Sequence, residues 1–419
     1  MLLECAETAH ADEFDREPIR YSTAPTNNVI TRLQERLKAG AVSLKFDDDH
    51  GYLRSVLQAL QVPVSSQVLV FSKTSLQRER IGPKTPRALY FNDDVYVGFC
   101  LHGTVLEISA VDPNLGTVFY TLDQEPVARP KFTRQNDACL QCHGSTQTRG
   151  VPGHLVRSVY ADRSGQAILS MGSFRVDQTT AFAQRWGGWY VTGTHGGQKH
   201  LGNFVVHGQR EPEEIDNRVG QNIIELRTHL TIANYLTPHS DLVALMVLEH
   251  QAEMHNLIAR ANLQTRLALY EEAELNRELG RAADYRSETT LRRIKNAGEP
   301  LVRYLLFSKE TPLTAKVRGT SSFADEFARR GPRDAHGRSL RDFDLEKRLF
   351  KYPCSYLIYS NAFDALPEAV KTYVYGRMHD VLGGRDYSHE FDHLGTEDRR
   401  VIREILQVTK PELARAMGE

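Results

Sequence analysis

The sequence predicts an α+β protein, in which an antiparallel sheet domain is followed by a mainly α-helical C-terminal region. Short β-rich runs separated by turn residues repeat between residues 67 and 120. From Pro212 onward, apolar residues recur instead at helical spacing. The expected segments are a disordered tail or signal-peptide remnant at 1–20, an α+β domain at 21–210, a helical domain with one long helix at 211–309, a linker at 310–345 and a C-terminal helical segment at 346–419.

Two helices are expected ahead of the sheet. Residues 28–38 carry apolar side chains at helical spacing before Gly40, and residues 52–60 repeat the pattern. Short strands are then expected at 67–71, 88–91, 95–99, 105–108 and 117–120, with turns between them. The turn Arg163-Ser164-Gly165 predicts a second hairpin that pairs residues 155–160 with 167–170.

The C-terminal region is expected to contain several helices. The stretch Pro238-His239-Ser240-Asp241 is expected to form a break and an N-cap ahead of a long periodic segment that ends near Gly280. A further helix at 289–308 contains Pro300, which should kink or split it. The other expected helices are 213–235, 367–382 and 396–409.

The composition is that of an ordinary soluble globular protein. The chain has 419 residues, of which 41% are hydrophobic and 25% are charged. Lysine and arginine number 52 against 53 acidic residues, and the net charge of -1 points to neither nucleic acid nor an anionic membrane. No apolar run is long enough to span a bilayer.

The most informative stretch is the pentapeptide Cys139-Leu140-Gln141-Cys142-His143, a C-x-x-C-H motif. Two thiols at this spacing can each add across a haem vinyl group, and the adjacent imidazole can then bind the iron as an axial ligand. The chain has only 5 cysteines, so two of them at this spacing directly before a histidine are not expected by chance. The motif therefore predicts one covalently bound haem c with its iron.

This motif resembles that of the c-type cytochromes, and the resemblance covers residues 139–143 only. It implies that Cys139 and Cys142 form the thioether links and that His143 is the proximal iron ligand. Small soluble c-type cytochromes are all-helical and carry the motif close behind an N-terminal helix. Here the motif follows several predicted strands and is expected in a loop, so the chain would be an atypical member.

Two other interpretations of the cysteine pair stay open. A thioredoxin-like dithiol requires a βαβ setting and gives His143 no role. A zinc site requires further ligands, and no second C-x-x-C pair follows. Cys5, Cys100 and Cys354 are single cysteines, typical of small buried side chains.

The sixth iron ligand is left open by the sequence. His195 and His200 are preferred, because they lie in the glycine-rich loop 185–203 that also holds both tryptophans. A glycine-rich surface loop held by its aromatic residues is the alternative for this stretch. Competing ligand candidates are Met171, His250 and Met254.

Covalent haem attachment takes place outside the bacterial cytoplasm, so the motif predicts an export signal. The first residues contain no basic region and no adequate apolar core, yet Ala9-His10-Ala11 has the A-x-A form of a signal-peptidase site. We therefore expect a periplasmic or otherwise extracytoplasmic protein, with a signal sequence upstream of Met1 or truncated there. The alternative is a disordered tail in a chain that stays in the cytoplasm.

Three functions follow from these residues. The first is a monohaem c-type cytochrome-like protein that transfers single electrons and meets a redox partner protein. The second is a haem-based sensor or peroxidase-like enzyme with an open iron site. The third is a cytosolic zinc or dithiol protein without haem. The sequence contains no G-x-S-x-G, Walker A or H-E-x-x-H motif, and it points to no catalytic residue and no oligomeric state.

Overall fold

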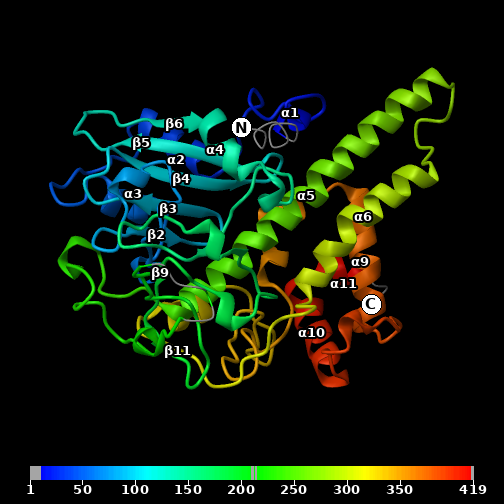
Figure 1. Ribbon diagram of the computed structural model, residues 1–419. Helices are drawn as coiled ribbons and strands as arrows, with labels where there is room; N and C mark the ends of the chain where they lie inside the picture. The colour runs from blue at the N-terminus through cyan, green and yellow to red at the C-terminus, as the bar shows by residue number, and fades with distance from the viewer. Residues whose placement is uncertain (1–10, 209–211, 213–214, 417–419) are drawn as a thin grey trace.

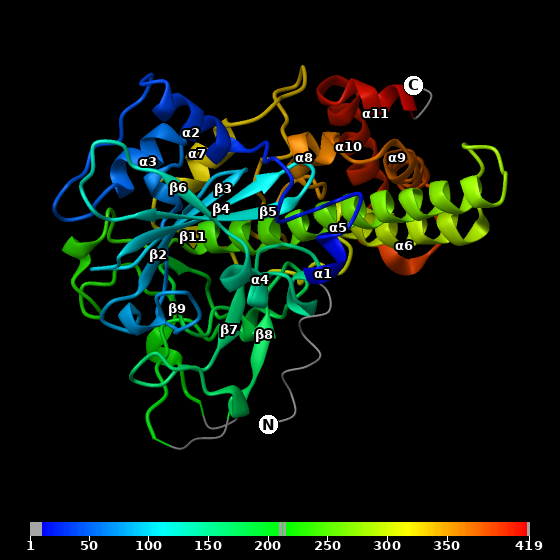
Figure 2. The same ribbon diagram turned by 90° about the horizontal axis from the view of Figure 1, so that it is seen from above.

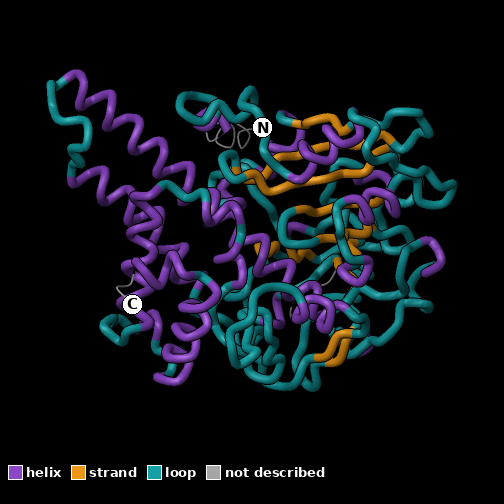
Figure 3. The backbone as a smooth tube through the Cα atoms, turned by 180° about the vertical axis from the view of Figure 1, so that it is seen from behind, coloured by secondary structure: helices purple, strands orange, loops and turns teal. Residues whose placement is uncertain are grey.

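The computed structural model describes residues 11–208, 212 and 215–416. It confirms the α+β class, because an antiparallel sheet fills the N-terminal half and the C-terminal region is mostly helical (Figure 1). Viewed from behind, the strands gather on one side of the molecule and most helices on the other (Figure 3).

The main sheet has seven strands in the order β6-β5-β4-β3-β2-β1-β9, and every neighbouring pair is antiparallel. Its strands are β1 (Val68–Val70), β2 (Arg87–Phe91), β3 (Val95–Phe99), β4 (Val105–Asp112), β5 (Gly116–Asp123), β6 (Phe132–Gln135) and β9 (Trp189–Tyr190). Two small ribbons pair β7 (Arg157–Val159) with β8 (Ser173–Arg175), and β10 (Gly193–Thr194) with β11 (Arg318–Gly319).

The sheet has two different faces because side chains alternate along each strand. In β4, Leu106, Ile108 and Ala110 are buried, whereas Glu107 and Ser109 are partly exposed. The buried set packs in one core cluster with α2 (Val29–Lys38) and α3 (Leu53–Ala59). Figure 2 shows α2 and α3 on one side of the sheet, with α4 (Asp137–His143), β7 and β8 on the other.

The long periodic segment forms α5 (Leu242–Glu278), as predicted. The side chain of Asp241 caps it by accepting from the N–H groups of Val243 and Ala244. Gly280 follows the helix with a left-handed φ of 64°. The chain then returns as α6 (Glu288–Leu305), which keeps Pro300 inside one continuous helix. The two helices form a hairpin whose tip extends from the body (Figure 1).

The remaining helices are α1 (Ala11–Phe14), α7 (Phe323–Arg329), α8 (Asn361–Asp364), α9 (Glu368–Leu382), α10 (Thr396–Thr409) and α11 (Pro411–Ala416). A second buried cluster joins α5 to the sheet, to α6 and to these C-terminal helices, through residues such as Val68, Leu245, Leu301, Val374 and Ile402. The helical region and the sheet therefore share one core along α5.

The structure corrects several sequence predictions. No α-helix forms in the described part of the segment 213–235, where only two short 3-10 turns occur. The apolar positions Val219 and Ile224 are exposed, at 92% and 62%, so this segment buries no continuous apolar stripe. The turn at residues 163–165 forms, with Ala161 bridged antiparallel to Ala167 and the N–H of Ile168 donating to the carbonyl of Tyr160. The strand β7, however, pairs with β8 at 173–175 and not with the segment 167–170.

Two further differences concern the motif and the expected linker. Residues 137–143 form the helix α4, where a loop was expected. The segment 310–345 contains α7, and its Phe323 and Phe327 are fully buried in the core shared with α5. Ala9 and His10, which belong to the signal-peptidase pattern, lie outside the described residues.

Candidate functional site

The short helix α4 presents the C-x-x-C-H motif at the edge of the sheet, directly after β6. Its first hydrogen bond runs from the N–H of Leu140 to the carbonyl of Asn136, and Gly144 closes it by donating to Leu140. Cys139 and Cys142 stand three positions apart, so their side chains project from the same side of the helix. Both are free thiols; Cys139 is partly exposed and Cys142 is exposed.

His143 is held by a double contact with Gly153. Its Nδ1 lies 2.9 Å from the carbonyl oxygen of Gly153, and the N–H of Gly153 donates to the carbonyl of His143 at 2.8 Å. A carbonyl oxygen only accepts, so Nδ1 must carry the proton in the neutral ring. The lone pair is thereby placed on Nε2, which forms no hydrogen bond with any residue that the structure describes.

The electrostatic surroundings keep His143 neutral. Burial lowers the pKa of His143, while the hydrogen bond to Gly153 acts in the opposite direction. Arg87 also lowers this pKa, and Glu107 raises it. These last two form an ion pair of 2.8 Å across the partly exposed face of the sheet. A neutral imidazole with a free lone pair is the form that binds a metal.

The thiol of Cys139 is held in its protonated form. Burial, followed by the nearby Glu107 carboxylate, raises its pKa to about 11. Thiolates that attack disulfides or other electrophiles generally have a lowered pKa, often created by a nearby cation or a helix N-terminus. The surroundings of Cys139 are therefore those of a thiol without thiolate reactivity.

A group of buried polar side chains lies next to the motif. The ring nitrogens of His154 contact the hydroxyl oxygens of Ser109 and Thr117 at 3.0 and 3.2 Å. The ring of His154 lies 4.1 Å from that of Tyr96, whose hydroxyl is 3.1 Å from Nδ1 of His255 on α5. Burial lowers the pKa of His255 to about 4, so its imidazole is uncharged at neutral pH.

The structure does not bring His195 and His200 together with His143. The motif follows β6 at one edge of the sheet, whereas these two histidines follow β9 and β10, and β9 is the opposite edge. Six strand spacings separate the two edge strands, which corresponds to about 29 Å. The rings of His195 and His200 contact each other at 4.7 Å and pack against Phe182, whereas His143 packs against Phe119.

The lone pairs of these two histidines are also occupied. The N–H of Asn222 donates to Nε2 of His195 at 3.1 Å, and the N–H of Gly202 donates to Nδ1 of His200 at 3.0 Å. Burial lowers the pKa of His200 to about 3. Both side chains therefore act as buried acceptors for the backbone of their own loop.

The other ligand candidates, His250, Met254 and Met171, are buried core side chains. His250 and Met254 are fully buried within α5, and both ring nitrogens of His250 are hydrogen-bonded, to Gln178 and Ser355. Met171 packs in a small apolar cluster with Tyr160 and Val206.

The two tryptophans of the glycine-rich loop are core residues. Trp186 is fully buried, and its Nε1 donates to Glu249 of α5 at 3.2 Å. Trp189 is buried and donates to the carbonyl of Arg157 at 2.7 Å. The two tryptophans thus hold the loop to α5 and β7.

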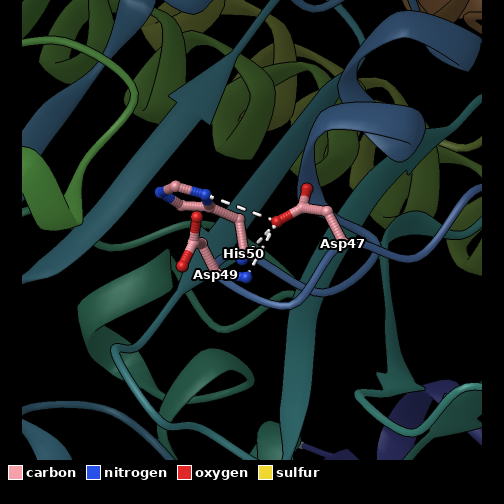
Figure 4. A group of neighbouring side chains, drawn as sticks. All are labelled: Asp47, Asp49 and His50. Carbon is pink, nitrogen blue, oxygen red and sulfur yellow. Dashed lines mark hydrogen bonds and ion pairs between the residues drawn. The ribbon is translucent and has the colours of Figure 1, made fainter.

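A second group of possible metal ligands comprises Asp47, Asp49 and His50 in a tight turn before α3 (Figure 4). One carboxylate oxygen of Asp47 accepts from the backbone N–H groups of Asp49 and His50, so this turn explains the clustering without an ion. Nδ1 of His50 faces Asp47 at 3.6 Å, whereas its buried, unpartnered Nε2 lies on the other side of the ring. The group gives no independent indication of a bound cation.

Sequence reasoning missed three residues that support His143. Gly153 accepts from its ring, His154 follows in the chain, and Asn256 of α5 binds the backbone of His154 at 2.8 Å. Gly153 and His154 lie in the stretch Val151-Pro152-Gly153-His154, where a glycine after proline was the one available signal of a special turn.

No protein-family model, no curated protein and no solved structure matches this chain. Within the described residues, no helix is both long and apolar enough to cross a membrane.

Proposed function

We propose that this chain is a monohaem c-type cytochrome-like protein that binds one haem covalently and transfers single electrons outside the cytoplasm. The observation that carries the proposal is the state of His143. Its Nδ1–H is committed to the carbonyl of Gly153, and its Nε2 lone pair is left free, while the free thiols of Cys139 and Cys142 precede it on the same short helix. A hydrogen bond from the ring N–H that does not bind the metal is the usual means by which proteins orient a metal-binding imidazole.

The residues present fit a covalently attached haem. Cys139 and Cys142 project from one side of α4 and are not joined to each other or to other cysteines. Thioether formation adds an S–H group across a vinyl double bond, so the raised pKa of Cys139 is compatible with it. His143 would supply the proximal ligand, and the haem would supply a one-electron iron couple. A redox partner protein is part of this proposal.

The dithiol and zinc alternatives receive less support. A redox dithiol is favoured by a lowered thiol pKa, and that of Cys139 is raised to about 11. A structural zinc site needs four ligands. Among the described residues, the only group of three or more possible ligand side chains within 4.8 Å of one another is the Asp47 turn, which does not include the motif.

A second candidate function is a sensor or peroxidase-like protein with an exchangeable iron position. The observation that favours it is the environment of His195 and His200, whose lone pairs accept backbone N–H groups in a different part of the fold. An iron held by His143 without either of them would bind solvent, a gas or a peroxide at its sixth position.

Expression with a cytochrome c maturation system tests the proposal. Denatured protein should keep its haem and give a pyridine haemochrome spectrum of a thioether-linked haem. Cys139→Ala combined with Cys142→Ala should abolish covalent haem, whereas the control Cys100→Ala, at a buried cysteine of the sheet domain, should retain it. The proposal is refuted if the folded wild-type protein carries no covalent haem while a known c-type cytochrome matures in the same cells.

Carbon monoxide separates the two haem functions. A reduced spectrum that does not change on addition of carbon monoxide indicates two fixed axial ligands and an electron carrier. A spectrum that shifts indicates an exchangeable position and supports the sensor or peroxidase-like function.

A further inference from the structure

We propose that Asn256 is a positioning residue for His143, acting through the single peptide unit that joins Gly153 to His154. This inference deepens the proposed function, because it names the residue that regulates the proximal ligand. Its first observable, the tautomer of His143, does not require haem.

Asn256 is committed to the backbone of His154 from both ends of its amide. It lies on α5 and is 1% exposed. Its Oδ1 accepts from the N–H of His154 at 2.8 Å, and its Nδ2 donates to the carbonyl of His154 at 2.8 Å. Nδ2 also lies 3.4 Å from a carboxylate oxygen of Glu253. A donor and an acceptor face their complements, so the orientation of the amide is fixed.

Gly153 allows this approach because it has no side chain. A Cβ at this position would lie 2.3 Å from Oδ1 of Asn256 and 3.2 Å from Cβ of Thr148. The glycine thus brings the loop backbone directly against the amide of α5.

The two hydrogen bonds on either side of this peptide form one chain. Asn256 binds the N–H of the peptide between residues 153 and 154, and His143 donates to the carbonyl of the same peptide. Hydrogen bonds in series polarise one another, so the bond at the N–H strengthens the carbonyl as an acceptor. Asn256 therefore strengthens the bond that keeps the proton of His143 on Nδ1 and the lone pair on Nε2.

The loop has other anchors that do not depend on Asn256. The ring nitrogens of His154 contact Ser109 and Thr117 on the sheet, and the N–H of Gly153 is bound to the carbonyl of His143. Loss of the Asn256 amide should therefore weaken the polarised bond while leaving the loop in place.

The test compares Asn256→Ala with Asn262→Ala. Asn262 is a matched control, because it is a buried asparagine of the same helix whose Nδ2 donates to the carbonyls of Pro113 and Ala365. The protein without haem is labelled with nitrogen-15 at histidine, and the signal of His143 is assigned by its loss in His143→Gln. The tautomer is read from the multiple-bond nitrogen–proton couplings of the ring.

We expect the wild type and the Asn262→Ala variant to show the Nδ1–H tautomer, and the Asn256→Ala variant to show a measurably larger share of the Nε2–H tautomer, because the hydrogen bond to Gly153 is weakened but not removed. Asn256→Asp should restore the wild-type pattern, because a carboxyl oxygen at this position still accepts from the N–H of His154. If the Asn256→Ala variant does not fold, Asn256→Ser removes both hydrogen bonds with less loss of volume and replaces it. A wild-type tautomer in the folded alanine or serine variant overturns the inference.

The haem-loaded protein gives a second readout. A weaker Nδ1–H bond makes the imidazole a poorer donor to the oxidised iron, so the reduction potential of the Asn256→Ala variant should rise, and that of the Asn262→Ala variant should not. Absence of covalent haem in the wild type would refute the proposed function and leave the tautomer result intact. A dependence of the tautomer on Asn262 as strong as that on Asn256 would refute the positioning role alone.

Discussion

His250 should make the protein sensitive to mild acid. The side chain is fully buried within α5, where Nδ1 lies 2.7 Å from Oε1 of Gln178 and Nε2 lies 2.8 Å from Oγ of Ser355. The glutamine oxygen only accepts, so the neutral ring carries its proton on Nδ1 and accepts from the serine. Burial, followed by the nearby His255, lowers the pKa of His250 to about 3.

The stability change follows from the difference between the folded and unfolded pKa. An unfolded histidine titrates near about 6.5, so the stabilising contribution is present above that pH and is lost as the pH falls toward the folded value. Between about pH 7 and about pH 5 the unfolded chain takes up most of one proton at His250, whereas the folded chain takes up almost none. Integration over this interval gives a loss of about 2 kcal/mol in the free energy of unfolding for this single residue.

Urea unfolding at these two pH values tests the prediction. The wild type should lose about 2 kcal/mol more on acidification than His250→Gln, even though the variant is less stable at neutral pH. Asn262→Ala is the matched control, because it removes the hydrogen bonds of a buried side chain of α5 that does not titrate, and its loss of stability on acidification should equal that of the wild type. Equal losses in the wild type and in His250→Gln would refute the reasoning.

Three further substitutions test contacts around α5. Gly153→Ala places a Cβ 2.3 Å from Oδ1 of Asn256 and should cost about 1–3 kcal/mol of stability by urea unfolding and reduce haem attachment. Asp241→Ala removes the carboxylate that caps α5 and leaves buried N–H groups unpaired, so the free energy of unfolding should fall by about 2–4 kcal/mol in the same assay. Trp186→Phe removes the donor to Glu249 and should lower the thermal unfolding midpoint, with a cost of about 1–3 kcal/mol.

The sequence predicted well those elements whose signals are local. In α5 the capping aspartate, the long apolar period and Gly280 agree, and the helix begins and ends where they indicate. The segment 213–235 shows the opposite case. Asn217 donates to the carbonyls of His200 and Gly202, and these contacts hold an irregular loop that periodicity could not reveal.

The candidate site divides in the same way. The thiols and His143 are neighbours in the chain, so their spacing alone indicated chemistry. The residues that orient the imidazole are distant: the bond between Asn256 and His154 joins positions 102 residues apart. That bond uses the backbone N–H of His154, which every residue except proline has, so the residue type at position 154 gives no signal of it. The residues that orient a metal ligand, unlike the ligand itself, can therefore be identified only from a structure.

The position of His195 and His200, more than their hydrogen bonds, decides their relation to the iron. Releasing a ring nitrogen from a backbone N–H costs about 1–3 kcal/mol, which ligation to a metal can offset. Moving a loop from the β9 edge of the sheet to the β6 edge would require breaking the buried contacts of Trp186 and Trp189. An iron bound to His143 must then take its sixth ligand from nearer the motif or from solvent. The carbon monoxide experiment distinguishes these two outcomes. A protein ligand at the sixth position indicates an electron carrier, and solvent there indicates a protein that binds an external ligand.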